Sequence, residues 1–318
     1  MAEILDRIQM ISAVIIHDAR AQTLVRPGER LERLATGATW SEGPVWLHED
    51  GSVLWSDIPN NRMLRWHPRE GLSVWRDHID FVNGHTRTAD GSLLHCSHGR
   101  RAIVRTPMRN GQACGADEVV VERYQGRRLN SPNDVIVKSD GTIWFSDPPY
   151  GIISDREGHR ADSELGDNYV FRYEPQTGAL DIASDFVEEP NGLAFSPDES
   201  VLYVSDTSAA LRTDGTGHHH IVAFDVLAGR SLANPRVFAV VEPGLADGFR
   251  IDERGWLYTS SADSVQVYHP DGARLAVIPV PEKVGNLCFG GANRDELYIC
   301  ASSSLYRIRL NARGIQTP

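Results

Sequence analysis

One short pattern occurs six times along the sequence, and this repeat constrains the fold more than any other feature. Each copy has a polar turn, Asp-Gly in three of them, followed by a short apolar run rich in β-branched and aromatic residues. Another apolar run follows each copy and a further one precedes it. The six copies are DGSVLWSD (50–57), DGSLLHCSH (90–98), DGTIWFSD (140–147), DESVLYVSD (198–206), ERGWLYTSS (253–261) and RDELYICAS (294–302).

These runs favour strands over helices, because they are short, alternate in polarity and are bounded by turn residues. The repeat unit is about 40 to 60 residues long and contains no convincing amphipathic helix, which is typical of the four-stranded blades of a β-propeller. Six units predict an all-β, six-bladed β-propeller. We expect the propeller domain to span residues 39–318, preceded by an N-terminal extension of residues 1–38.

The strand expected before each turn opens with an acidic or an amide residue. Each of these residues precedes the same point of the next strand by 12 or 13 positions. The innermost strand of a blade lines the propeller axis, so the first residues of all six strands are expected at one mouth of the channel. The six residues are Glu42, Asn83, Asn133, Asn191, Asp247 and Asn286.

Two carboxylates and four amides in one small volume form a donor set made of oxygen. Oxygen ligands suit calcium, magnesium or manganese, whereas a tight structural zinc site would need Cys or His. Two buried carboxylates also repel each other unless a cation lies between them. The alternative reading is that Asn-Gly and Asp-Gly only form turns. The shared register favours a divalent metal ion in the central channel.

Composition and net charge limit the kinds of molecule and the cell compartments expected for this protein. The net charge of −11 argues against a nucleic-acid partner, whose phosphates select a basic surface. No apolar stretch is long enough to span a membrane, and Glu3 and Asp6 precede the short apolar run 10–16, which disfavours a signal peptide. We therefore expect a cytoplasmic protein, with a periplasmic location as the alternative, that is a monomer or a homodimer. The four cysteines have no metal or redox spacing and are expected to be free thiols.

Several segments resemble the family of senescence marker protein, gluconolactonase and luciferin-regenerating enzyme. With the blade pattern, the similarity covers residues 40–310, and the branch that it resembles most is that of the bacterial gluconolactonases. The segments are WSEGPVW (40–46), NSPNDVIVKSDGTIWFSDPPYG (130–151), EPNGLAFSPD (189–198), YVSDT (203–207), GHHHIVAFDV (217–226) and ADGFRID (246–252).

The resemblance implies calcium-dependent hydrolysis of a sugar lactone, glucono-1,5-lactone, with zinc, manganese and magnesium as alternative ions. Matched motif by motif, it implies that the cation is held by Glu42, Asn133, Asn191 and Asp247. It also implies that Asp247 is the catalytic acid/base. We expect the substrate contacts to come from Asn83, Asn130, Asn286 and His98, with a packing role as the alternative for His98.

Ser131 departs from the animal members of the family, which have a substrate-binding Arg at this position, so their substrate contacts do not transfer. The alternative functions are hydrolysis of another lactone or of an organophosphate-type phosphotriester, and non-catalytic calcium binding. No G-x-S-x-G motif indicates a serine hydrolase. The irregular stretch 150–168 is either a lid or a surface insertion.

Two further motifs have structural interpretations. The repeated aspartates Asp57, Asp147 and Asp206 are expected to cap turns, with Asp206 the first candidate for another role. The histidines at 218–220 are interpreted as a loop that leads into a strand rather than as a metal site.

Overall fold

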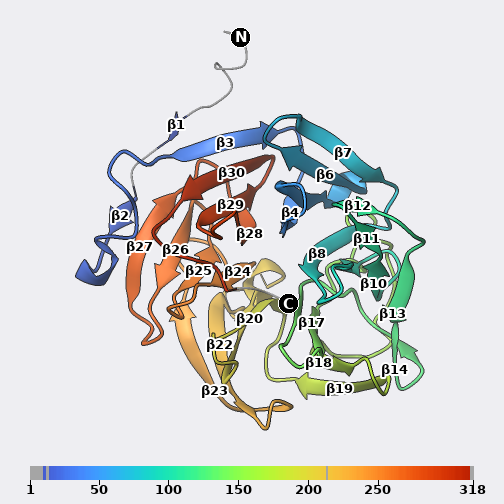
Figure 1. Cartoon of the computed structure of the whole chain (residues 1–318). Coiled ribbons are helices and arrows are strands. Elements are labelled where there is room, and N and C mark those ends of the chain that lie inside the picture. The colour runs from blue at the N-terminus through green and yellow to red at the C-terminus, as the bar shows by residue number, and fades with distance from the viewer. Residues whose placement is uncertain (1–9, 12–13, 213, 316–318) are drawn as a thin grey trace.

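Six β-sheets stand around a central axis in the computed structural model, which describes residues 10–11, 14–212 and 214–315 (Figure 1). The predicted all-β fold and the predicted number of blades are confirmed. Parts of the predicted extension (1–38) and the last residues of the predicted propeller domain (39–318) lie outside the described residues. Among the helices of the described residues, none is long and apolar enough to cross a membrane.

The first three blades are antiparallel sheets of four strands each, which follow the chain order from the axis outward. Blade 1 consists of β4 (Ser41–Leu47), β5 (Ser52–Asp57), β6 (Arg62–His67) and β7 (Gly71–Asp77). Blade 2 consists of β8 (Val82–Arg87), β9 (Leu93–Ser97), β10 (Ala102–Thr106) and β13 (Glu118–Val121). Blade 3 consists of β16 (Val135–Val137), β17 (Ile143–Asp147), β18 (Tyr169–Glu174) and β19 (Ala179–Ser184).

The last three blades follow the same order from the axis outward, except that strands from the N-terminal segment form the outer edges of blades 5 and 6. Blade 4 consists of β20 (Pro190–Phe195), β21 (Val201–Asp206), β22 (His220–Leu227) and β23 (Ser231–Val240). Blade 5 consists of β24 (Phe249–Ile251), β25 (Leu257–Ser260), β26 (Ser264–Tyr268), β27 (Arg274–Pro279) and the short β2 (Ile15–Ile16). Blade 6 consists of β28 (Val284–Gly290), β29 (Glu296–Ala301), β30 (Ser304–Arg309), β3 (Leu31–Thr36) and β1 (Met10–Ile11).

Short elements complete the fold. One hairpin interrupts blade 2 between β10 and β13, a second lies between blades 2 and 3 in the sequence, and three turns of 3₁₀-helix occur in the described part of the chain. The hairpins are β11 (Met108–Arg109) with β12 (Gln112–Ala113), and β14 (Arg123–Tyr124) with β15 (Arg127–Arg128). The 3₁₀ turns are η1 (Ala19–Ala21), η2 (Ile58–Asn60) and η3 (Ser208–Ala210).

The N-terminal segment closes the ring. Strand β3 pairs antiparallel with β30, so a segment from the predicted extension forms the fourth strand of blade 6. The propeller strands therefore begin before residue 39. The repeat did not predict β3, because the strand is separated from the rest of its blade by the whole ring. Pairing at this position covers an edge of β30 that would otherwise remain open.

A separate apolar core lies between each pair of neighbouring blades. Strands buried on both faces send alternate residues to opposite sides. Trp144, for example, packs into the core between blades 3 and 4, whereas Phe145 packs into the core between blades 2 and 3. Between blades 1 and 6, Trp46 stacks on Tyr298 with ring centroids 5.4 Å apart. Because apolar residues hold the blades together on both faces, the ends of the inner strands are free to carry polar side chains.

Candidate functional site

The residues that open the inner strands meet at one mouth of the channel. A cavity of about 460 Å³ lies there, and five of the six opening residues line it: Glu42, Asn83, Asn133, Asn191 and Asp247. Asn286 is buried (3% exposed) but does not line the cavity. Its Oδ1 accepts a hydrogen bond from the backbone N–H of Leu287 at 2.8 Å.

Irregular strand pairing occurs at these opening residues. In β4 the register shifts between Glu42 and Val45, and in β20 it shifts between Pro190 and Leu193. Strands β8 and β28 shift at equivalent places. Such bulges bend a strand and redirect a side chain. The bulge thus separates a polar residue at the axis from the apolar residues that pack between blades.

Glycine follows the opening residue where neighbouring blades approach most closely. A Cβ on Gly43, whose φ is 52°, would lie 2.2 Å from the carbonyl oxygen of Asn83. A Cβ on Gly192 would lie 2.4 Å from the carbonyl oxygen of Asp247, to which the Gly192 N–H donates at 3.0 Å. These contacts leave no room for a side chain. They fix the spacing between opening residues of adjacent blades.

Blades 3 and 6 depart from this rule, because Asp134 and Leu287 follow their opening residues, and only Asp134 adds a charge. The Asp134 side chain is 1% exposed, and its Oδ2 lies 3.4 Å from Nη1 of Arg250. Its Oδ1 accepts a hydrogen bond from the N–H of Val135 at 3.0 Å. Burial raises the pKa of Asp134, and the Arg250 charge offsets part of that rise. Sequence reasoning missed this third carboxylate, although a non-glycine residue at this register was a signal for it.

The two carboxylates of the cavity are held in an environment that disfavours their charge. Burial raises the pKa of Glu42 well above its usual value, and the charge of Asp247 raises it further. Burial also raises the pKa of Asp247 to about 7, although the nearby Lys283 lowers it. A cation between the two carboxylates would offset both effects.

The amide nitrogens of two asparagines are used by neighbouring residues. His98 Nδ1 lies 2.8 Å from the carbonyl oxygen of Glu157 and must donate to it, so His98 Nε2 is the acceptor for Nδ2 of Asn83 at 3.4 Å. Asn191 Nδ2 donates to Oγ1 of Thr207 at 3.5 Å. In both residues the side-chain oxygen is therefore left for the cavity.

The donor set fits a hard divalent cation. Within the described residues, Glu42 Oε1 and Asn83 Oδ1 are buried and have no hydrogen-bond partner. Buried oxygens without a donor are rare, since leaving them unpaired costs about 1–3 kcal/mol. Carboxylate and amide oxygens are the ligands that calcium prefers. Unpaired oxygens on two neighbouring blades indicate a cation or a substrate hydroxyl at this place.

The stretch 150–168 forms part of the cavity wall. Tyr150, Arg156 and Glu157 line the cavity. The Tyr150 hydroxyl lies 2.6 Å from Oγ1 of Thr207, which joins this stretch to blade 4. Burial raises the pKa of Glu157, whereas the charge of Arg156 lowers it.

Two wall residues beside the axis escaped the sequence analysis. Lys283 lines the cavity near Trp40, with its Nζ 5.3 Å from the centroid of the Trp40 ring. Trp40 lies two positions before Glu42, within a segment that carries the family resemblance. Its place beside an axial residue was a usable signal, whereas nothing in the repeat singles out Lys283.

Besides Asn286, two more residues expected to contact substrate do not line the cavity. Asn130 is fully buried, and its Nδ2 donates to the carbonyl oxygen of Asp167 at 2.9 Å while its Oδ1 accepts from Ser163 at 2.6 Å. His98 is 1% exposed and supports Asn83 instead, as described above. Both side chains hold the wall in place. Ser131 does so too, because its hydroxyl joins Pro148 to Gly151.

The repeated aspartates hold the segments that lead into the inner strands, which confirms their interpretation as turn caps. Asp57 Oδ1 accepts from the N–H of Thr39 at 2.8 Å, and Asp147 Oδ2 accepts from the N–H of Asn130 at 2.8 Å. Asp206 Oδ2 accepts from the N–H of Glu188 at 3.2 Å. The predicted free thiols are also confirmed, since Cys96, Cys288 and Cys300 are buried and unpaired.

The chain is a six-bladed propeller with carboxylate and amide side chains around a cavity on its axis. Residues 40–303 match the family described as the SMP-30/gluconolactonase/LRE-like region. The chain belongs to this family.

Individual relatives cover most of the chain. It is 33% identical over 302 residues to a gluconolactonase from Zymomonas mobilis. The aligned region covers 89% of this chain and 82% of the relative. The chain is 29% identical over 271 residues to a pentonolactonase from Haloferax volcanii. The aligned region covers 83% of this chain and 82% of the relative. The solved structure of a gluconolactonase from Xanthomonas campestris superimposes with a TM-score of 0.85 at 40% identity, covering 95% of this chain and 97% of that one.

Proposed function

We propose that this protein is a metal-dependent hydrolase of sugar lactones, with glucono-1,5-lactone as the expected substrate. The observation that carries the proposal is the meeting of two carboxylates and three amides in one cavity. Relatives named gluconolactonase and pentonolactonase support a lactone substrate.

Glu42, Asn133, Asn191 and Asp247 are proposed to hold one divalent cation, and calcium is the expected ion. When bound, the cation supplies Lewis acidity to the lactone carbonyl and offsets negative charge that develops on its oxygen. Asn83, whose Oδ1 faces no donor in the described part of the chain, is proposed to contact the cation or a substrate hydroxyl.

Asp247 is proposed to accept the proton of the water that attacks the carbonyl carbon, and to return it to the ring oxygen as the ring C–O bond breaks, so that this oxygen leaves as a hydroxyl. Burial raises the pKa of Asp247 to about 7 in the absence of a cation, and a bound cation would lower it, so the carboxylate would be ionised and able to accept a proton when the site is occupied. Its backbone is well fixed, because its N–H donates to Ser260 Oγ at 2.7 Å and its carbonyl oxygen accepts from Ser205 Oγ at 3.0 Å. A fixed backbone keeps the carboxylate aimed at the cavity.

Lys283 and Arg156 are proposed to orient the substrate. Both line the cavity, and the structure shows no ion pair for either among the described residues. Their positive charges would attract the hydroxyl groups of the lactone and the carboxylate that hydrolysis creates. Together they favour a polar, oxygen-rich substrate over an apolar ester.

Proton release from glucono-1,5-lactone tests the proposal directly. The protein is first treated with a chelator and then receives calcium, magnesium, manganese or zinc singly. We expect hydrolysis to stop on chelation and to return with at least one ion. A phosphotriester substrate is assayed in parallel, because the same site could polarise a phosphoryl oxygen. Absence of chelator-sensitive hydrolysis of every aldonolactone tested would reject the proposal and leave a non-catalytic cation-binding propeller.

A further inference from the structure

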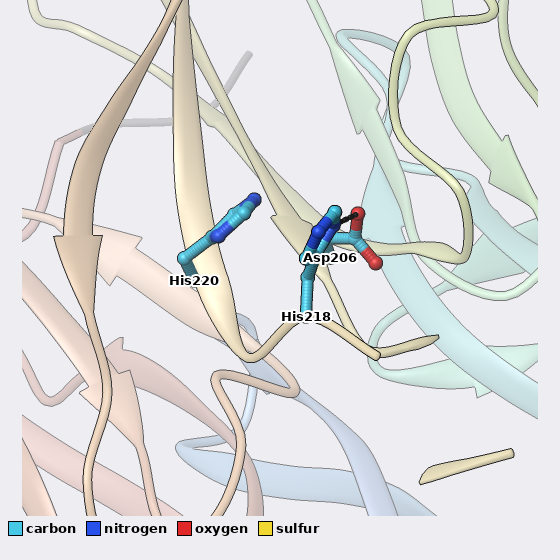
Figure 2. Close-up of side chains that lie close together, drawn as sticks. All are labelled: Asp206, His218 and His220. Atoms are coloured by element: carbon cyan, nitrogen blue, oxygen red, sulfur yellow. Dashed lines mark hydrogen bonds and ion pairs between the residues drawn. The ribbon is translucent and has the colours of Figure 1, made fainter. Parts of the chain in front are cut away.

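A second group of metal-ligating side chains lies in blade 4, outside the axial donor set. Asp206, His218 and His220 each offer one ligand atom, and these atoms lie within 4.8 Å of one another. Figure 2 shows the ring of His220 pointing toward the Asp206–His218 pair. We call these three residues the blade-4 cluster. From the sequence, the histidines were expected to form a loop leading into a strand, and β22 does begin at His220.

Strand register explains why the three side chains meet. Asp206, at the end of β21, pairs directly with His220, at the start of β22, so the two side chains lie on the same face. His218 is two residues before His220, and its ring stacks on that of His220 with centroids 4.7 Å apart. His218 Nδ1 lies 3.3 Å from Oδ2 of Asp206.

His219 points away from the cluster. Its Nδ1 donates to the carbonyl oxygen of Val241 at 2.9 Å, as expected for the intervening residue of an extended segment. The three consecutive histidines are therefore not equivalent. Two face Asp206, and the third provides a matched control.

We propose that Asp206, His218 and His220 form a second metal site, which binds a divalent transition metal ion such as zinc or cobalt. Two imidazole nitrogens with one carboxylate oxygen suit these ions, whereas calcium favours oxygen ligands alone. The His218 side chain is 44% exposed, which leaves room for water to complete the coordination. The carboxylate of Asp206 is held in a fixed orientation, because the backbone N–H groups of Ser208 and Glu188 donate hydrogen bonds to it.

Charge around the cluster also favours a cation. The charges of Glu188 and Asp206 both act on His220. The positive side chain paired with Glu188 is Arg212, at 2.9 Å, and it is 44% exposed. A divalent ion would therefore enter a region with more negative than positive charge.

The site would act on the wall of the axial cavity. Asp206 and His218 are at the two ends of the loop 207–217, which carries the wall residues Thr207, Ala210 and Leu211. The ends are already joined by the N–H of His218, which donates to Oγ of Ser208 at 2.7 Å. An ion bridging the ends would restrict this loop further. The second ion is thus inferred to stiffen one side of the cavity.

Cobalt titration tests the site in the full-length protein with calcium in excess to occupy the axial oxygens. Visible absorption reports nitrogen ligation of cobalt. We expect one equivalent to bind, the double variant His218→Gln/His220→Gln to bind at least about tenfold more weakly, and His219→Gln to bind like the unmodified protein. Zinc should displace the cobalt and raise the Tm of the unmodified protein but not that of the double variant.

Three results would overturn the proposal: no cobalt absorption in the presence of calcium, equal binding by the double variant, or weaker binding by His219→Gln. The readout does not depend on catalysis. Failure of the lactonase proposal would therefore leave the cobalt result interpretable, and the reverse also holds.

Discussion

The axial cavity and the blade-4 cluster assemble their donors in opposite ways. The axial donors come from five blades, are all oxygens and span residues from Glu42 to Asp247. The blade-4 cluster comes from the end of β21, the start of β22 and the residue two positions before β22, contains two imidazoles and spans only residues 206–220. A repeated strand register thus gives a site for a hard ion, whereas one local cross-strand pairing gives a site for a borderline ion. Because the two sites share no residue, we expect that a substitution can abolish the function of either site without affecting the other.

The largest expected effect separates catalysis from the blade-4 cluster. Asp247→Asn should lower kcat for lactone hydrolysis by about 100- to 10,000-fold, because the amide cannot accept the proton of water. Cobalt binding to the same variant should be unchanged. Proton release and cobalt absorption on one preparation measure both. Asp181→Asn, which removes a 54% exposed carboxylate of blade 3, is the control. Unchanged turnover in Asp247→Asn would refute its role.

The second effect concerns stability of the metal-free protein. The pKa of Asp247 is about 7 in the folded state and near 3.8 when unfolded. Between these values the unfolded chain loses the proton first, so stability falls as pH rises from about 4 to 7, by at most about 4 kcal/mol. Asp247→Asn should therefore equal the unmodified protein at pH 4 and exceed it at pH 8. Added calcium should remove the difference at pH 8.

Urea unfolding of both proteins across this pH range, with and without calcium, measures the effect. The difference between the two proteins isolates Asp247 from Asp147 and Glu189, whose pKa values burial also raises to about 7. A difference that does not change with pH would contradict the environment assigned to Asp247.

A third experiment tests whether the two sites select different ions. Glu42→Gln keeps one side-chain oxygen but removes a charge, so calcium affinity should fall by about tenfold or more while cobalt affinity stays the same. His218→Gln should do the reverse. Calorimetric titration with each ion measures both variants. Parallel loss of both ions in either variant would show that the two sites are not independent.

The smallest effect concerns the cavity wall. Lys283→Met should raise KM for the lactone by about two- to fivefold and leave kcat nearly constant, because the exposed charge orients substrate without touching the proton transfer. Initial rates over a range of lactone concentrations give both constants. Arg230→Met, which removes a 64% exposed positive charge, serves as the control. A selective loss of kcat would assign Lys283 a role in the chemistry.

The parts predicted from the sequence are those repeated six times. The opening residues share a register, so their meeting followed once the blades were counted, and five of them line the cavity. Strand β3 carries no copy of the repeat and pairs with β30 across almost the whole chain, which no local pattern reveals. The same reason hid Lys283, whose place in the wall depends on the closed ring.

The other incorrect predictions concern the direction in which a side chain points rather than the position of the residue in the fold. Asn130 lies in the segment that most resembles the family, yet the stretch 163–168 engages its amide. The three histidines look alike in sequence, and only the pairing of β21 with β22 separates the two that face Asp206 from the one that does not. Side-chain direction depends on register and on neighbours, and a single sequence contains neither explicitly.

The pairing of β3 with β30 also sets an order of events during synthesis. Strand β3 is made before the inner strands of all six blades and must wait for β30, which follows them all, before the ring can close. The ring around the axial cavity is therefore closed only after β30 has left the ribosome. The blade-4 hairpin needs only residues 201–227 and can pair much earlier. Between the synthesis of β3 and that of β30, the edge of β3 is unpaired and open to incorrect pairing with other strands.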